Sequence, residues 1–251
     1  MQNQIEKVIQ FLVCPQKDFI DKIEKGKRKP NKLHIGYQGA IKLRGDEEKR
    51  EADFFIETVA RMFDDDIEGS EKIYVIIDED WHPKSCPEFE VFNPHCVKGT
   101  EGARLPGKLE EFRRHPRTRI IRANSINVAS SPNYKKILEE VCGETRLSNI
   151  RVGVFGVWTH VKVEYLMFNL HTLTPKFFFD QMAICEPLCA SPQREFHNLA
   201  IKKFRNDFKI NVYDNIDRYC SDWLGLNPDK LLPKLDRHQE GTDDVETENS
   251  L

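Results

Sequence analysis

Short apolar runs alternate with amphipathic segments along most of this chain. Five of the runs predict strands, at 5–14, 72–80, 117–123, 150–157 and 176–185, and the first two are expected to be buried. Four segments between and after these runs predict helices: 51–63, 133–142, 159–171 and 193–208. A last strand and a short helix follow in 209–225. The alternation predicts an α/β fold, with a doubly wound, mostly parallel sheet and helices on both faces.

Three segments interrupt this pattern. Residues 21–51 are polar, basic and glycine-bearing, and residues 81–109 contain prolines and glycines without periodicity, so both are expected to be long loops. Residues 238–251 are acidic and lack aromatic side chains, which is typical of disorder. We therefore expect one domain over 1–237 and a disordered tail over 238–251.

Composition narrows the class of protein. The 251 residues are 39% hydrophobic and 31% charged, with a formal net charge of −3, so no excess of basic charge favours a nucleic acid or a membrane as partner. No apolar run reaches the roughly 20 residues that span a bilayer, and the first residues do not have the pattern of a signal peptide. Seven cysteines without a C-x-x-C pair favour a reducing, cytoplasmic environment.

The strongest chemical pattern follows the second predicted strand. Ligand sites of such sheets collect at the carboxyl ends of the strands, and there Asp80 and His82 are two residues apart and point to the same side. Glu88 and His95 follow in a loop long enough to fold back. Two imidazoles and two carboxylates suit a divalent ion such as zinc, iron(II) or manganese. Isolated residues of these types are more often solvated, so the neighbouring motifs decide.

Those motifs resemble the nicotinamidase branch of the isochorismatase-like cysteine hydrolase superfamily. They are "DWH" at 80–82, "EF" at 88–89, "PHCVKGTEGARL" at 94–105, "VCPQKDF" at 13–19, "GVWTHVKV" at 156–163 and "CEPLCAS" at 185–191. They follow the family's order from about residue 5 to about residue 225. The resemblance implies a metal held by Asp80, His82, Glu88 and His95 that receives the ring nitrogen of a nicotinamide-like ligand. It also implies that the chain could form a homo-oligomer, although no pattern in the chain fixes the number of subunits.

The family's catalytic triad is not matched. The resemblance places the family's aspartate at Cys14, its nucleophilic cysteine at Lys162 and its lysine at Arg122, with Arg119 and Asn124 as other candidates for the lysine. An amine cannot replace the thiolate that a helix N-terminus and a carboxylate activate. The family's amide hydrolysis is therefore not expected from these positions.

The substitutions change the charge of the expected ligand pocket, formed by Cys14, Arg122, Trp158 and Lys162. Two added cations favour a small anionic ligand, because unpaired buried cations are costly. In the alternative, Lys162 pairs with a nearby carboxylate or reaches solvent, and the pocket is closed. Trp158 either stacks on a ligand or packs against the sheet.

Cys14 has three interpretations. It is a relocated nucleophile activated by Lys162 or Arg122, it lies beside a neutral Lys162 that forms Schiff bases, or it is a small buried side chain. The third is the commonest role of a free cysteine.

Three functions follow from these alternatives. In the first, which we favour, the chain is a nicotinamidase-like pseudoenzyme that binds a metal and a small ligand without hydrolysis. In the second, it is an active amidase with chemistry at Cys14 or Lys162. In the third, it is a structural or interaction protein with a closed pocket.

Overall fold

The computed structural model describes residues 4–20, 59–64, 69–173 and 179–227, and the side chains of residues 172 and 173 are left aside. The predicted loop 21–51, the start of the predicted helix 51–63, the tail 238–251 and the predicted domain boundary at 237 lie outside these residues. Within the described part of that helix, residues 59–62 are helical, as expected.

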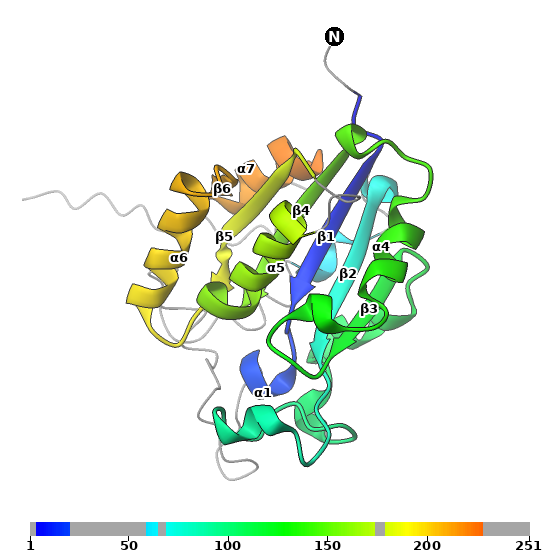
Figure 1. Ribbon diagram of the computed structural model, residues 1–251. Coiled ribbons are helices and arrows are strands. Elements are labelled where there is room, and N and C mark those ends of the chain that lie inside the picture. Colours follow the sequence, from blue (N-terminus) through cyan, green and yellow to red (C-terminus); the bar gives the residue numbers. More distant parts are fainter. Residues whose placement is uncertain (1–3, 21–58, 65–68, 174–178, 228–251) are drawn as a thin grey trace, which may run out of the picture.

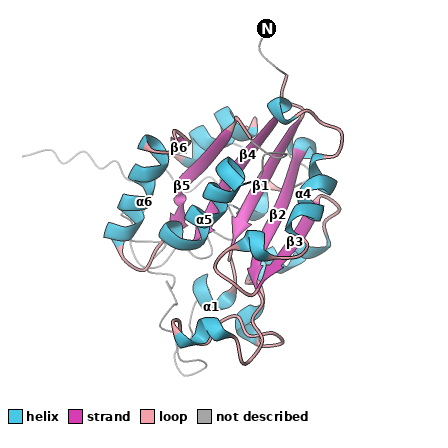
Figure 2. Cartoon of the chain, viewed as in Figure 1, coloured by secondary structure: helices cyan, strands magenta, loops and turns pink. Residues whose placement is uncertain are grey.

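Six strands form one sheet in which every pair is parallel. The strands are β1 (Lys7–Val13), β2 (Ile73–Asp80), β3 (Thr118–Ala123), β4 (Ile150–Val157), β5 (Met182–Ala190) and β6 (Asn211–Tyr213). Their order across the sheet is β3-β2-β1-β4-β5-β6. Figure 2 shows the strands with helices packed around them. The predicted doubly wound parallel sheet is confirmed.

The interior strands are buried along nearly their whole length, which requires cover on both faces. Every residue of β1 from Val8 to Val13 is buried, and β2 and β4 each have only one residue that is not. This burial explains why their sequences are continuous apolar runs instead of alternating patterns.

Except for the short helix Lys17–Ile20, which was not predicted, the following helices lie where the sequence predicts them but are less regular. They are α1 (Lys17–Ile20), α4 (Tyr134–Cys142), α5 (Glu164–Phe168), α6 (Arg194–Asn206) and α7 (Ile216–Arg218). Wide π-type turns over Thr159–Val163 and Asn169–Leu173 extend α5 into the predicted helix 159–171, and another, Tyr219–Leu224, follows α7. In Figure 1, α5 crosses in front of the sheet. None of the described helices has the length and apolar character needed to cross a membrane.

The fifth strand differs from the prediction. It begins at Met182 and continues past Pro187 to Ala190, whereas the apolar run predicted a strand over 176–185. β6 pairs only with Ala183–Cys185, and the pairing with β4 shifts register before Cys189. The missing N–H of Pro187 therefore falls where neither ladder requires it, so the strand can pass through a proline.

The predicted loop 81–109 carries short 3₁₀ turns, over Pro87–Glu90, Glu101–Ala103 and, reaching beyond 109, Gly107–Arg114. A bridge between His82 and Val97 closes its first part into a compact unit. Figure 1 shows this region with α1 below the carboxyl ends of β1, β2 and β3. The loop thus covers the edge where ligand sites of parallel sheets form.

β1 and β4 approach closely where the order of the strands changes direction. Gly156 has a φ of +131°, and a Cβ atom there would lie 2.2 Å from the carbonyl oxygen of Val13. Only glycine allows this approach. It brings the end of β1 next to the turn that follows β4, and both contribute to the site described below.

Candidate functional site

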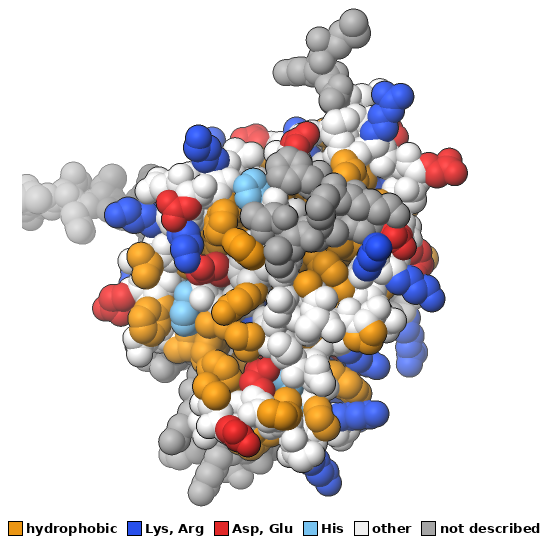
Figure 3. Space-filling view, viewed as in Figure 1, with side chains coloured by type: hydrophobic (Ala, Val, Ile, Leu, Met, Phe, Trp, Pro, Cys, Tyr) orange, Lys and Arg blue, Asp and Glu red, His pale blue; other side chains and the backbone are white. Residues whose placement is uncertain are grey.

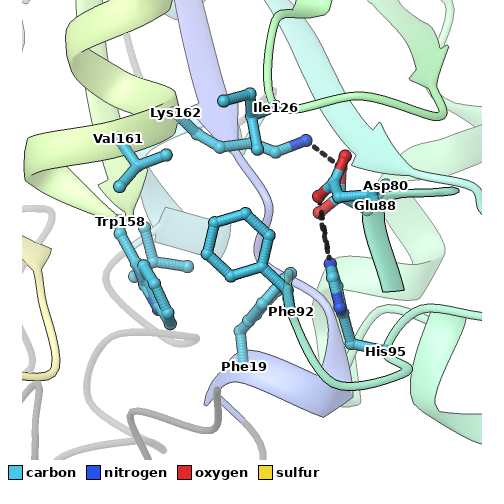
Figure 4. A pocket seen from close by; sticks show the side chains of 10 residues that line it. Phe19, Asp80, Glu88, Phe92, His95, Ile126, Trp158, Val161 and Lys162 are labelled. Atoms are coloured by element: carbon cyan, nitrogen blue, oxygen red, sulfur yellow. Dashed lines mark hydrogen bonds and ion pairs between the residues drawn. The ribbon is translucent and has the colours of Figure 1, made fainter. Parts of the chain in front are cut away.

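A narrow cavity lies beyond the carboxyl ends of β2 and β4, where about 310 Å³ is free of protein atoms if its open mouth is included. Its lining consists of Phe19, Asp80, Glu88, Phe92, His95, Ile126, Val157, Trp158, Val161 and Lys162. Figure 4 shows the charged groups together at one end and the aromatic side chains at the other. The lining therefore offers a ligand one polar end and one apolar, aromatic end.

At the polar end, four side chains from the end of β2 and the loop after it face one another. The Oδ2 atom of Asp80 lies 3.5 Å from Nε2 of His95 and 3.6 Å from Nε2 of His82. The Oε1 atom of Glu88 lies 3.8 Å and 4.0 Å from the same two nitrogens. The structure thus brings together the four residues that the sequence predicts as metal ligands.

The geometry of this group suits a divalent ion. Ligand atoms about 2.1 Å from a tetrahedral zinc ion are about 3.4 Å apart, close to the separations here. Asp80, His82 and His95 can each offer an atom such that all three lie within 4.8 Å of one another. Among the described residues, buried Oδ2 of Asp80 and Nε2 of His82 have no hydrogen-bond partner. Such atoms are costly to bury unless something binds them.

Both imidazoles are in the protonation state that binds metals. Burial lowers the pKa of His82, and the neighbouring His95 lowers it further. Burial also lowers the pKa of His95, while the carbonyl of Asn93 partly opposes this shift. Nδ1 of His95 lies 2.7 Å from that carbonyl oxygen, so it carries the proton and leaves Nε2 free for a metal.

Gln16 holds the backbone of Asp80 in place. Its side-chain amide donates to the carbonyl oxygen of Asp80 at 2.7 Å and accepts from the Asp80 N–H at 2.8 Å. It also donates to the carbonyl oxygen of Ala103 at 3.0 Å, which ties the loop to the end of the strand. Sequence reasoning did not single out Gln16. A polar residue two positions past a buried strand was the available signal.

A second contact anchors His95. The carboxylate of Asp18, in α1, accepts a hydrogen bond of 2.8 Å from the backbone N–H of Cys96. A Cβ atom on Gly102 would lie 2.0 Å from this carboxylate, so the glycine leaves room for it. This contact explains one glycine of the "GTEGA" motif by packing alone.

Lys162 lies in the first turn after β4, and its side chain enters the cavity. Its ammonium group forms an ion pair with Oδ1 of Asp80 and donates to the carbonyl oxygen of Ser125 at 2.9 Å. The Asp80 carboxylate is therefore shared, with Oδ1 toward Lys162 and Oδ2 toward the two imidazoles (Figure 4). Of the two sequence-based alternatives for Lys162, the structure has the ion pair, and a narrow cavity that opens to solvent remains beside it.

The structure does not bring Arg122 to the cavity, contrary to the sequence-based expectation. Its guanidinium stacks 4.1 Å over the ring of Trp81 and donates to Oε2 of Glu79 at 3.2 Å. Arg119 pairs with Glu140 at 2.7 Å instead. Side chains alternate between the faces of a strand, and Arg122 follows buried Ile121 and precedes buried Ala123, so it points outward. Ser125 and Ile126, beyond the strand end, occupy the corresponding part of the site.

Cys14 is fully buried behind the cavity and does not line it. Its backbone has a φ of +46°, and its N–H donates to the carbonyl oxygen of Asp78 at 2.8 Å. Burial raises the pKa of its thiol, although the charge of Lys162 opposes part of the shift. A buried neutral thiol matches the third interpretation of Cys14, as a small side chain that fills space.

The apolar end of the cavity is a series of aromatic contacts that reaches the surface. Trp158 lies edge-on to Phe92 at 6.4 Å and stacks on His160 at 5.7 Å. His160 in turn stacks on Phe196 of α6 at 4.9 Å. Figure 3 shows hydrophobic side chains gathered over α5 and α6 on this face. Trp158 lines the cavity and packs on its neighbours, and its stacking on a ligand stays a prediction.

Neither the known family models nor the curated proteins include a match to this chain. Solved structures do resemble it. The nicotinamidase of Bacillus subtilis is 20% identical over 83% of this chain and 99% of its own, with a TM-score of 0.61. An isochorismatase-like hydrolase from Alkaliphilus metalliredigens is 19% identical over 86% and 99%, also at 0.61.

A third similar structure was solved with a bound metal ion. The pyrazinamidase of Pyrococcus horikoshii, solved in complex with zinc, is 17% identical over 83% of this chain and 99% of its own, with a TM-score of 0.54. These similarities cover nearly the whole of each relative. The chain therefore has the α/β fold of the nicotinamidases and isochorismatase-like hydrolases.

Proposed function

We propose that this chain binds a divalent metal ion through Asp80, His82, Glu88 and His95 and holds a small ligand in the adjoining cavity without hydrolysing it. One observation carries the proposal. At the place where the resemblance puts a nucleophilic thiol, the chain has the ammonium group of Lys162, ion-paired with Asp80. An ammonium in an ion pair has no lone pair with which to attack a carbonyl carbon.

The metal and the cavity walls define the kind of ligand. A bound ion would coordinate one donor atom of the ligand, and the walls formed by Phe92, Trp158 and Ile126 favour a flat apolar body. Among the described residues, Asp80 and Ser125 accept two of the three N–H bonds of Lys162. The third can meet an acceptor on the ligand. A small heteroaromatic acid would satisfy all three features.

The charge of the site supports a carboxylate but not a strongly anionic ligand. Arg122 lies outside the cavity, and Asp80 neutralises Lys162, so the excess of two cations expected from the sequence does not arise. Burial raises the pKa of nearby Asp78 to about 6, while Lys162 opposes the shift, and Asp78 is mostly charged at neutral pH. The metal would then supply most of the positive charge that a ligand meets.

Two other functions have less support. A hydrolase with its nucleophile at Cys14 needs a reactive thiolate, but this thiol is buried and its pKa is raised. A purely structural protein has no need of an open cavity beside two unpartnered metal-binding atoms.

The first test is metal analysis of the purified chain together with an assay for ammonia release from nicotinamide. We expect about one equivalent of zinc, iron or manganese and no ammonia. The Cys14→Asp/Lys162→Cys double variant introduces the side chains that the resemblance puts at these positions. Any ammonia that the variant releases would show that the native Cys14 and Lys162 prevent hydrolysis. Ammonia release by the unchanged protein would contradict the proposal.

The second test compares ligands on the metal-loaded protein by calorimetry. Nicotinate has a ring nitrogen for the metal and a carboxylate for Lys162, whereas nicotinamide has a neutral amide in the same place. We expect nicotinate to bind at least ten times more tightly, and we expect Lys162→Met to reduce that preference. Equal affinities for nicotinate and nicotinamide would contradict the proposed role of Lys162 in ligand binding.

A further inference from the structure

We infer that the thiol of Cys86 positions the imidazole of His82 for metal binding and thereby sets the metal affinity of the site. The inference rests on the proposed metal site and adds a residue that no motif assigns to it. Cys86 is a positioning residue, because it touches a ligand side chain and not the place where the metal would lie.

The contact is local and buried. Cys86 follows His82 by four residues, just before the 3₁₀ turn Pro87–Glu90, and its side chain is 5% exposed. Its Sγ atom lies 3.4 Å from Nδ1 of His82 and 3.6 Å from the carbonyl oxygen of Asn124, which follows β3. The thiol thus links the metal-binding loop to the end of a neighbouring strand.

The direction of these hydrogen bonds follows from the position of the metal-binding atoms. Nε2 of His82 is fully buried, has no hydrogen-bond partner among the described residues, and faces Asp80 and Glu88. To bind a metal, Nε2 must offer its lone pair, so the ring proton must be on Nδ1. His82 then donates to Sγ, and the thiol donates its own proton to Asn124. This arrangement fixes both the tautomer and the ring orientation of His82.

The two histidines of the site are held by different partners. His95 donates from Nδ1 to the carbonyl oxygen of Asn93 at 2.7 Å, a short bond to a strong acceptor. His82 contacts a sulfur atom, which is a weak acceptor. The carbonyl of Asn124 is also close enough to raise the pKa of His82 slightly against the effect of burial. Without the thiol, the ring would keep that carbonyl and its edge contacts with Phe89 and His95, but it would lose the contact between Sγ and Nδ1.

The test measures metal binding by the purified full-length chain after its metal has been removed with a chelator. Co²⁺ is titrated by its visible absorption, and Zn²⁺ is titrated by competition with a chromophoric chelator. Removal of a group that orients a metal ligand typically costs 10–100-fold in metal affinity. We expect Cys86→Ala to lower the affinity for both ions by that factor and to shift the Co²⁺ absorption bands.

Two further variants separate positioning from general packing. Cys86→Ser keeps an acceptor and a donor, so it should retain more of the affinity than Cys86→Ala. Cys142→Ala removes another buried thiol, at the end of α4, and should bind both ions like the unchanged protein. Circular dichroism confirms that each variant is folded. If Cys86→Ala does not fold, Cys86→Ser alone must show weaker binding and shifted bands.

The outcomes distinguish this inference from the proposed function. If the unchanged chain binds no metal, both fail. If the unchanged chain binds Co²⁺ and Zn²⁺ and Cys86→Ala binds them equally well with the same absorption bands, the metal site stands and the role of Cys86 is overturned. If Cys142→Ala weakens binding as much as Cys86→Ala, the effect is one of packing and the inference is also overturned.

Discussion

Glu79 and Asp80 are consecutive carboxylates on β2, both buried, and they point to opposite faces of the sheet. Glu79 has a cation at each oxygen, with Arg113 at 2.5 Å from Oε1 and Arg122 at 3.2 Å from Oε2. Asp80 has one cation, Lys162, at Oδ1, while Oδ2 faces two imidazole nitrogens. Charge burial alone therefore does not identify a site. What separates the two is the group that faces the second oxygen, which is a guanidinium at Glu79 and a pair of imidazole nitrogens at Asp80.

The largest expected effect comes from Lys162→Met in the metal-free protein. Asp80 would lose the one Lys or Arg that pairs with it in the described part of the chain, and an unpaired buried charge costs about 3–5 kcal/mol of stability. A divalent ion should restore that stability, because it also neutralises Asp80. Urea unfolding with and without Zn²⁺ measures both effects. Lys203→Met is the matched control: its ion pair with Glu164 is exposed and worth at most about 1 kcal/mol. A Zn²⁺ response no greater than that of the unchanged protein would contradict the shared role of Asp80.

The next effect concerns metal binding itself. Asp80→Asn should weaken Zn²⁺ binding by more than the 10–100-fold typical of a change outside the ligand set. Glu79→Gln, one residue away on the other face, should leave the metal affinity unchanged and act on stability alone. Competition with a chelator measures the two affinities. Equal losses of Zn²⁺ affinity in both variants would contradict a metal site on the Asp80 side of β2.

A smaller effect is expected when Glu79 loses one of its two partners. Arg113→Met leaves Arg122 in place. We therefore expect the free energy of unfolding to fall by about 2 kcal/mol, which is below the range for a completely unpaired buried charge. Arg122 is 47% exposed, and Arg122→Met should cost less than about 1 kcal/mol. Zn²⁺ should rescue neither variant. A rescue by Zn²⁺ would show that Glu79 also belongs to the metal site.

The smallest effect is a pH dependence of the metal-free protein. The pKa of His82 is lowered in the folded state, so the unfolded chain binds a proton on this imidazole at a higher pH than the folded chain does. His82 therefore contributes a loss of stability as pH falls below the unfolded pKa of about 6.5. The variant His82→Asn should lose less stability between pH 7 and pH 5 than the unchanged protein. Unfolding midpoints across that range give the difference, and parallel curves for the two proteins would contradict the lowered pKa.

Most of the fold was predictable because local patterns encode it. Largely apolar runs marked β1, β2 and β4, since strands covered on both faces favour apolar side chains at successive positions, and the shorter run of Ile120 and Ile121 marked β3. The pattern failed at β5, where Pro187 is an apparent stop signal. Whether a strand can pass through a proline depends on which neighbours pair with it, and that is a property of the assembled sheet.

The candidate metal ligands Asp80, His82 and His95, with Glu88, could also be found in the sequence, because they lie within one short stretch whose neighbouring motifs resemble those of a known family. The sequence by itself thus determined the fold class, the edge of the sheet where the site forms, and the four side chains able to hold a divalent ion. It also determined that an amine stands where the resemblance expects a thiol.

Only the tertiary structure decided how the remaining charges are arranged. It paired Lys162 with Asp80, turned Arg122 toward Glu79, buried Cys14 behind the cavity, and placed Gln16 and Cys86 against two of the candidate metal ligands. These contacts join residues from different strands and loops. The physical reason is that ion pairing and desolvation depend on distance and burial, which sequence separation does not contain.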